Sequence, residues 1–146
     1  MRRFLFDTGV FIYALGGDHP YREPCRQVLR EVRDRRLGAE ASVELIHEFA
    51  YVRLRQSGNR IEAARSARSI MRSFSLHVVE PSDMERAVDL WCEHERLDVR
   101  DAIFAAQALN REIGAILTPD RDFDGIVGLQ RIDPADAEAV ASLTAR

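Results

Sequence analysis

Acidic side chains that follow expected strands are the residues of this sequence that could do chemistry. Asp7 comes directly after the apolar run FLF, and Asp120, Asp122 and Asp124 come after the apolar run AILT. A carboxylate so close to a buried strand is costly unless something pairs with it. Several carboxylates within a few ångströms also repel one another, and a hard divalent cation such as Mg²⁺ or Mn²⁺ removes that repulsion.

Three more acids extend the pattern. Glu44 is expected in the first turn of a helix after the second strand, and Asp98 and Asp101 stand at or before the start of the helix AIFAAQAL. Ligands of open α/β sheets bind beyond the carboxyl ends of the strands, where the following helices begin, so these acids should converge on one edge. A metal there could lower the pKa of a bound water and stabilise charge on a phosphodiester. Helix capping explains single acids equally well, and both explanations stay open.

The elements that must position these acids alternate between strands and helices. Strands are expected at FLF, LGAEA, SLHVVE, AILT and LQRID. Helices are expected over Val10–Leu15 with Thr8 as cap, Tyr21–Asp34, VELIHEFAYVRLRQ, Arg60–Ser73, Ser82–Glu95, LDVRDAIFAAQALNREIG and a short segment from Pro134. This alternation predicts an α/β fold with a mostly parallel sheet, in a single domain over residues 1–146.

Apolar spacing gives two of these helices an expected inner face. In the helix Arg60–Ser73 the inward residues are expected to be Ile61, Ala64, Ala67, Ile70 and Met71. In the helix Ser82–Glu95 the apolar spacing falls on Met84, Ala87, Val88 and Trp91. Such spacing is typical of a stripe that faces a core.

Composition excludes several function classes. The net charge is −3, so the protein has no overall basic charge of the kind that indicates nucleic-acid binding. All 21 basic residues are Arg, so mechanisms that need a lysine, including a Walker-type nucleotide site, are excluded. No apolar stretch is long enough to span a bilayer and no signal peptide is apparent, so we expect a cytoplasmic protein. Two cysteines are too few for a disulfide framework and suit a reducing compartment.

Four segments, taken in order, carry a family resemblance. The pieces FLFDTGVFIYAL, SVELIHEF, LDVRDAIFAAQAL and TPDRDFDG resemble the PIN-domain ribonucleases, in particular the VapC-type toxins of prokaryotic toxin–antitoxin pairs. The resemblance covers nearly the whole chain. It implies a PIN-like α/β/α sandwich and a metal-dependent endoribonuclease.

The resemblance also implies a set of site residues. Asp7 and Asp101 would hold the principal Mg²⁺ or Mn²⁺ ion, and Glu44 and Asp122 would complete the site or position the attacking water. Asp122 is the preferred fourth acid, with Asp120 as the second candidate. The implied reaction is attack of water on an RNA phosphodiester, assisted by one or two ions. Asp98 could support this site or only cap its helix.

Partners follow from the same resemblance: an RNA substrate, a VapB-type antitoxin and a second copy of the chain in a homodimer. Apolar residues near the N-terminus could line an antitoxin groove or belong to the core; they are Val10, Phe11, Ile12, Tyr13, Leu15, Leu45, Phe49 and Val52. A basic stretch could contact phosphate or form a solvated face; it comprises Arg53, Arg55, Arg60, Arg65, Arg68 and Arg72.

Three alternatives remain beside this interpretation. FDTGV resembles the start of a haloacid-dehalogenase-type phosphatase motif, but Gly9 stands where that motif has a second Asp, and its usual lysine is missing. Glu44 with His47, and Cys92 with His94, could suggest zinc, but no clustered second pair follows. A catalytically silent PIN-like domain that only binds RNA or a partner is the third alternative.

Overall fold

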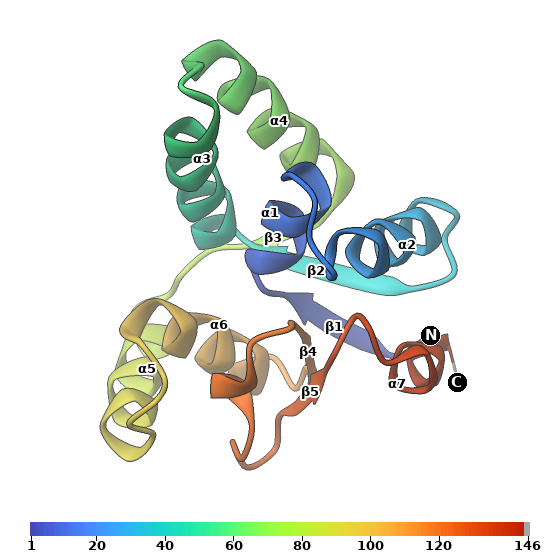
Figure 1. Ribbon diagram of the computed structural model, residues 1–146. Helices are drawn as coiled ribbons and strands as arrows, with labels where there is room; N and C mark the ends of the chain where they lie inside the picture. Colours follow the sequence, from blue (N-terminus) through green and yellow to red (C-terminus); the bar gives the residue numbers. More distant parts are fainter. Residues whose placement is uncertain (145–146) are drawn as a thin grey trace.

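Five parallel strands form the central sheet of this computed structural model, which describes residues 1–144 (Figure 1). The strands are β1 (Arg3–Phe6), β2 (Gly38–Ser42), β3 (Ser75–His77), β4 (Ala115–Leu117) and β5 (Gln130–Ile132). Their order is β3-β2-β1-β4-β5, and every neighbouring pair is parallel. The expected α/β fold is confirmed, with a sheet that is parallel throughout. Residues 145 and 146 of the expected domain lie outside the described residues.

Helices cover both faces of the sheet. They are α1 (Gly9–Leu15), α2 (Arg22–Arg33), α3 (Val43–Ser57), α4 (Arg60–Ser73), α5 (Pro81–Glu93), α6 (Val99–Asn110) and α7 (Ala137–Ala141), with single 3₁₀ turns η1 (Arg121–Phe123) and η2 (Ser142–Thr144). In Figure 1, α1 to α4 lie in the upper half of the view, around β2 and β3, and α5 and α6 lie at the lower left, beside β4 and β5. The chain moves from β1 outward to β3 and then returns to β4 on the other side of β1. Strand order therefore reverses between β1 and β4, where open α/β sheets bind ligands.

The central strand β1 has no solvent-facing side. Phe4, Leu5 and Phe6 are fully buried. The ring of Phe6 contacts Phe11 and Phe74 edge to face, with centroids 5.0 and 5.3 Å apart. A parallel strand with helices on both faces is apolar at consecutive positions for this reason. The first polar side chain after this strand, that of Asp7, is consequently buried as well.

Local signals at the helix ends explain where α3 begins and where it ends. The Ser42 hydroxyl accepts the Glu44 N–H and begins α3, as N-cap residues do. Gly58 ends α3 in the left-handed region, with φ of 65°, a conformation that glycine adopts without strain. Thr8 occupies the N-cap position of α1, but the expected side-chain cap is wrong. The Thr8 side chain makes no capping bond, and its hydroxyl donates to Glu48 on α3 instead.

The expected inner faces of α4 and α5 are only partly correct. Ala67 and Ile70 of α4 are buried, but Ile61 is 74% exposed and Met71 is also exposed. On α5 the exposed residues include Met84, Val88 and Trp91, although the same spacing predicted them to face inward. The reason is that α4 packs mainly on α3 and α5 mainly on α6, so a single neighbouring helix covers each of them. Within residues 1–144, no helix is both long and apolar enough to cross a membrane.

Candidate active site

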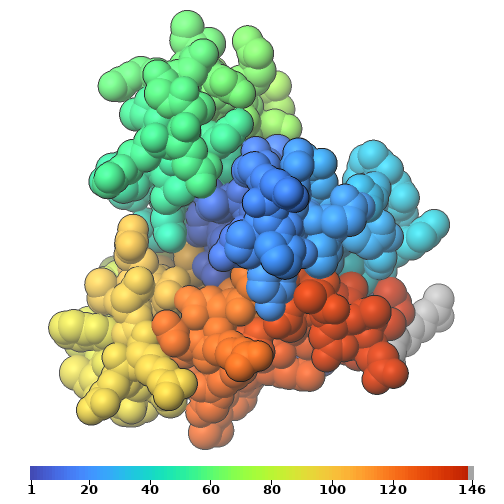
Figure 2. Space-filling model, viewed as in Figure 1, coloured from blue at the N-terminus to red at the C-terminus, as the bar shows by residue number. Residues whose placement is uncertain are grey.

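An acidic cavity of about 440 Å³ lies at the carboxyl ends of β1 and β4. Figure 2 shows the surface hollowed between α3, the segment that joins α1 to α2, and the start of α6. The lining combines five carboxylates with two tyrosines and one arginine: Asp7, Glu48, Asp98, Asp101 and Asp120, Tyr13 and Tyr21, and Arg121, together with Gly9 and Pro119. Two of the four predicted catalytic acids, Asp7 and Asp101, are thus brought together.

Asp7 is the most deeply buried of these acids, with only 6% of its surface exposed. The Thr118 hydroxyl donates to its Oδ2 at 2.7 Å, and the Thr8 N–H donates to its Oδ1 at 2.8 Å. Burial raises the pKa of Asp7 to about 7; the bonds from Thr118 and Thr8 lower it, while Glu48 and Asp120 raise it further. The fold therefore holds a carboxyl group where its ionised form is disfavoured until a positive charge arrives.

Asp101 lies opposite, in the first turn of α6. Burial is the main cause that raises the pKa of Asp101 to about 8, and the neighbouring charges of Asp7 and Asp98 add to it. Asp98 is the N-cap of α6, because its Oδ1 accepts the Asp101 N–H at 2.8 Å. Asp98 also lines the cavity, so it both caps its helix and adds negative charge to the site.

Glu48 rather than Glu44 is the glutamate that lines the cavity. Glu48 lies about one turn after Glu44 on α3, and its Oε2 accepts the Thr8 hydroxyl at 3.1 Å. Burial raises the pKa of Glu48, partly offset by the Thr8 bond and by the charge of Arg100. Glu44 instead lies beside His47, with its Oε1 3.3 Å from Nδ1. Glu44 does not line the cavity, although its charge is near enough to add to the raised pKa of Glu48.

The two candidates for the fourth acid differ in their position relative to the cavity. Asp120 lines the cavity, whereas Asp122 does not. The Asp120 N–H donates to Thr118 Oγ1 at 3.0 Å, and the Thr118 hydroxyl in turn bonds to Asp7. The Asp122 N–H donates to Asp120 Oδ1 at 2.9 Å, which makes Asp120 the cap of η1. Of the two candidates, Asp120 is therefore the one that shares the cavity with Asp7 and Asp101.

Sequence reasoning missed several neighbours of these acids. Thr118 stands two residues before Asp120 in TPDRDFDG, so the motif itself contained that signal. Tyr13 was expected in a partner groove or the core, and it lines the acidic cavity instead. Tyr21 comes from the other side of the turn between α1 and α2, and no sequence spacing relates it to Tyr13.

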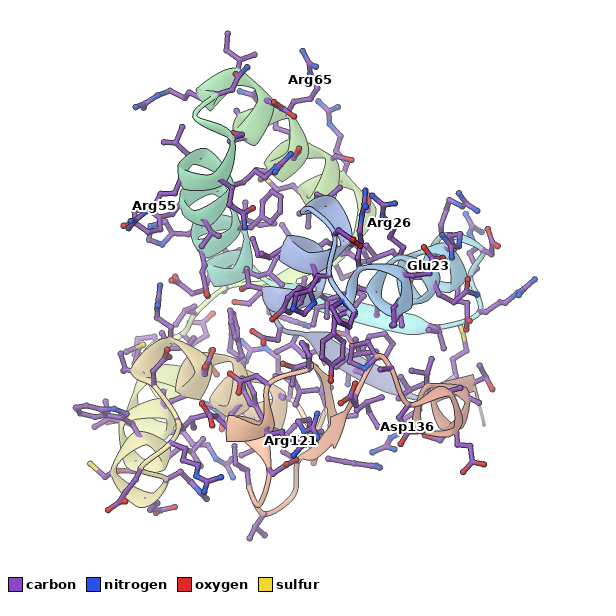
Figure 3. The ribbon with its side chains drawn as sticks, viewed as in Figure 1. Glu23, Arg26, Arg55, Arg65, Arg121 and Asp136 are labelled. Carbon is purple, nitrogen blue, oxygen red and sulfur yellow. The ribbon has the colours of Figure 1, made fainter. Side chains whose placement is uncertain are left out.

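The predicted basic stretch does not line the acidic cavity. Figure 3 shows Arg55 on the outer side of α3 and Arg65 on the upper part of α4, both away from Arg121. The Arg55 guanidinium lies 5.7 Å from the centre of the Tyr51 ring, and Arg53 pairs with Glu62 at 3.4 Å. The arginines of this stretch therefore lie on solvated faces or contact side chains near them. The arginine that lines the cavity is Arg121.

The donor set fits a hard divalent cation. Among residues 1–144, no three Asp, Glu, His or Cys side chains converge closely enough to hold an ion in the arrangement seen. The carboxylates of Asp7, Asp101 and Asp120 nevertheless share one cavity, and burial raises the pKa of the first two. Oxygen donors of this kind suit Mg²⁺ or Mn²⁺ and not zinc, which favours nitrogen and sulfur.

Comparisons with known proteins agree with this geometry. The sequence profile of the PIN domain matches residues 4–129. Ribonuclease VapC7 of Mycobacterium tuberculosis is 32% identical over 143 residues, which cover 95% of this chain and 96% of the relative. Ribonuclease VapC23 of the same species is 36% identical over 119 residues, which cover 78% of this chain and 90% of the relative. A toxin–antitoxin complex from Klebsiella pneumoniae shares the fold, with a TM-score of 0.66, 23% identity and coverage of 90% of this chain and 97% of the other.

The raised pKa values of Asp7 and Asp101 predict how stability depends on pH. Both folded-state pKa values, about 7 and about 8, exceed the unfolded value of about 4. The folded state therefore binds more protons than the unfolded state between those values, and stability falls as the pH rises. Without divalent metal, we expect Asp7 alone to lower the free energy of unfolding by about 2 kcal/mol from pH 5.5 to pH 8, and Asp101 to lower it by at least a similar amount.

Urea denaturation in EDTA at the two pH values measures this drop. Asp7→Asn should reduce it, because the amide does not ionise. Asp122→Asn is the matched control, since Asp122 is an acid outside the cavity lining. A stability that is flat or rises over this range in the unsubstituted protein would contradict the electrostatic account.

Proposed function

Because the chain belongs to the PIN-domain family and to its VapC ribonucleases, the toxins of type II toxin–antitoxin systems, we propose that the acidic cavity is where it hydrolyses RNA. The observation that carries this proposal is the gathering of Asp7, Glu48, Asp101 and Asp120 around one cavity. The haloacid-dehalogenase alternative is not supported, since Gly9 lines the cavity where a second Asp would be needed.

The residues that would hold a divalent cation are Asp7, Asp101 and Asp120. When bound, Mg²⁺ or Mn²⁺ would offset the carboxylate charges and act as a Lewis acid on the phosphodiester. Thr118 and Thr8 keep the Asp7 carboxyl group in one orientation, with one hydrogen bond to each oxygen. This positioning is what the chain itself contributes to the metal site.

Glu48 is suited to orient and deprotonate the attacking water. Burial raises the pKa of this carboxyl group above its usual value, which makes the carboxylate a stronger base. The water oxygen would bond to phosphorus while its proton moves to Glu48, and the bond from phosphorus to the leaving oxygen would break. The leaving oxygen would take a proton from solvent. Arg121 would contact a non-bridging phosphate oxygen from the cavity rim.

The antitoxin would bind elsewhere, in an apolar groove of about 560 Å³ between α1, α2 and α4. Its apolar lining consists of Phe11, Leu15, Leu29, Val32, Ile70 and Phe74. Arg33 and Arg35 belong to the same lining, so we propose that an antitoxin segment with apolar and acidic side chains fits here. Of the residues expected from the sequence, Phe11 and Leu15 line this groove, whereas Val10, Leu45 and Phe49 belong to the core.

The homodimer stays a prediction. Met84, Val88 and Trp91 form an exposed apolar stripe on α5, and Trp91 is 51% exposed. A second copy of the chain could cover such a stripe, since clustered exposed apolar side chains often mark protein interfaces.

A matched pair of glutamate variants tests the active-site assignment. Glu48→Gln should lower the rate of RNA cleavage at least about 100-fold, because it removes the proposed general base. Glu44→Gln changes a glutamate about one turn away, outside the cavity lining, and should stay within about twofold of the unsubstituted rate.

Cleavage would be followed on end-labelled single-stranded RNA with Mg²⁺ or Mn²⁺, and EDTA should stop it. Thermal melts of both variants check that each is folded. An inactive Glu44→Gln beside an active Glu48→Gln would return the role to Glu44. If no preparation shows metal-dependent cleavage, the result would favour the alternative of a catalytically silent domain that only binds RNA or a partner.

A second pair of variants tests the antitoxin groove. Leu15→Glu places an acid in the apolar lining and should weaken binding of the antitoxin encoded beside this gene at least tenfold, with RNA cleavage unchanged. Val127→Glu is the control, since Val127 is 90% exposed and outside the groove. Titration calorimetry measures the affinity, and equal affinities for the two variants would refute the groove assignment.

A further inference from the structure

Three aromatic rings stack beside the acidic cavity. The ring of Tyr13 lies 4.4 Å from that of His19 and 5.6 Å from that of Tyr21, measured between centroids. The centroids of His19 and Tyr21 are 6.1 Å apart, so the three rings form a compact cluster. The angles between ring planes are 29° for Tyr13 and His19, 17° for His19 and Tyr21, and 35° for Tyr13 and Tyr21. Tyr13 and Tyr21 also line the cavity that holds Asp7 and Asp101. We call these three residues the aromatic ladder.

The aromatic ladder is held in place from several directions. The Tyr21 hydroxyl donates to Asp133 Oδ2 at 2.9 Å, which ties the ring to the residue that follows β5. The Tyr21 N–H donates to His19 Nδ1 at 3.1 Å. Since a backbone N–H can only donate, Nδ1 is the acceptor of this bond. Pro20 stands between the two residues and fixes the backbone dihedral φ there.

These rings differ from the aromatic residues of the core. The core phenylalanines Phe6, Phe11 and Phe74 are packed edge to face. The ladder rings are closer to parallel; His19 is exposed and Tyr13 is half-buried. Apart from the two tyrosines, the lining consists of carboxylates, Arg121, Gly9 and Pro119. The ladder thus supplies flat aromatic surface to a cavity whose other groups suit a metal and a phosphate.

We propose that the aromatic ladder is a base-stacking platform, on which an unpaired nucleobase next to the scissile phosphate stacks while that phosphate lies at the acids. This inference rests on the proposed ribonuclease function and names the form of its substrate. Aromatic side chains stack on splayed-out bases of single-stranded RNA, whereas bases inside an A-form duplex are not accessible to them. Every base has a π-face, so the ladder selects an unpaired nucleotide more than a particular sequence.

The test combines a side-chain change with removal of a base. Asp7→Asn is the background protein, so that RNA stays intact, and Tyr13→Leu or Tyr13→Phe is added to it. Fluorescence anisotropy measures the binding of these proteins to a short single-stranded RNA that the active protein cleaves, and to versions with an abasic nucleotide on either side of the cleaved bond. Tyr51→Leu is the matched control, because Tyr51 is 54% exposed on α3 and outside the cavity lining.

Tyr13→Leu should weaken binding of intact RNA about tenfold, within the range measured for base–aromatic stacking. Tyr13→Phe keeps the ring and should retain most of the affinity, and Tyr51→Leu should bind as the background protein does. With the base removed at one of the two positions, the background protein and Tyr13→Leu should bind the abasic RNA equally weakly, because the ring then has no base to stack on.

Two results would overturn the platform. The first is that Tyr13→Leu binds intact RNA as tightly as the background protein does. The second is that, at both abasic positions, Tyr13→Leu still weakens binding by the same factor as it does with intact RNA, so that the two losses multiply. The second result would mean that Tyr13 acts through the fold and not through a base. Failure of the proposed function would look different, because the active protein would then cleave no RNA. In that case the same binding measurements are made on a uridine oligonucleotide with one abasic site, and the same outcomes support or overturn the platform.

Discussion

The carboxyl group of Asp7 is held nearly out of solvent at the end of the central strand, and much of the molecule follows from this placement. β1 is covered on both faces, so the residue that follows it is buried too. Strand order reverses beside β1, so α3 and α6 reach the same edge from opposite faces and bring Glu48 and Asp101. The pKa of each of these three carboxyl groups is raised, with burial as the largest cause. The topology thus buries these carboxyl groups and brings them near one another, and both effects disfavour their ionised forms. A divalent cation would offset both.

The short helix α1 connects the parts of the molecule that meet different partners. Its N-terminal end follows Asp7 and Thr8, and its residue Tyr13 lines the acidic cavity. Its residues Phe11 and Leu15 line the apolar groove between α1, α2 and α4. In the proposed function, RNA and antitoxin therefore contact two sides of one helix of seven residues. The predicted basic stretch on α3 and α4 belongs to neither surface, so the charge pattern of the sequence did not locate the proposed RNA site.

Much of the architecture was accessible from the sequence, because the parallel strands are short apolar runs and several helix ends have clear caps, such as Ser42. The expectation that Asp7 and Asp101 lie close together was also accessible, since Asp7 directly follows β1 and Asp101 lies in the first turn of α6. Glu44 and Glu48 lie about a turn apart on α3, and Glu48 is distinguished by its place in the cavity lining and its bond to Thr8, which no sequence spacing shows. The exposed stripe of α5 could not be foreseen either, because apolar spacing shows that a helix has a face without showing what covers it.

The most direct test of this account is the titration of the Asp7 carboxyl carbon by NMR, with and without Mg²⁺. Without the ion, we predict a midpoint near pH 7, because burial raises the pKa of Asp7 to about 7. With saturating Mg²⁺, the carboxylate should stay ionised over the same range, because the cation stabilises the charged form. A midpoint near pH 4 without the ion, or a titration that Mg²⁺ leaves unchanged, would contradict the claim that this buried carboxylate is the centre of a metal site.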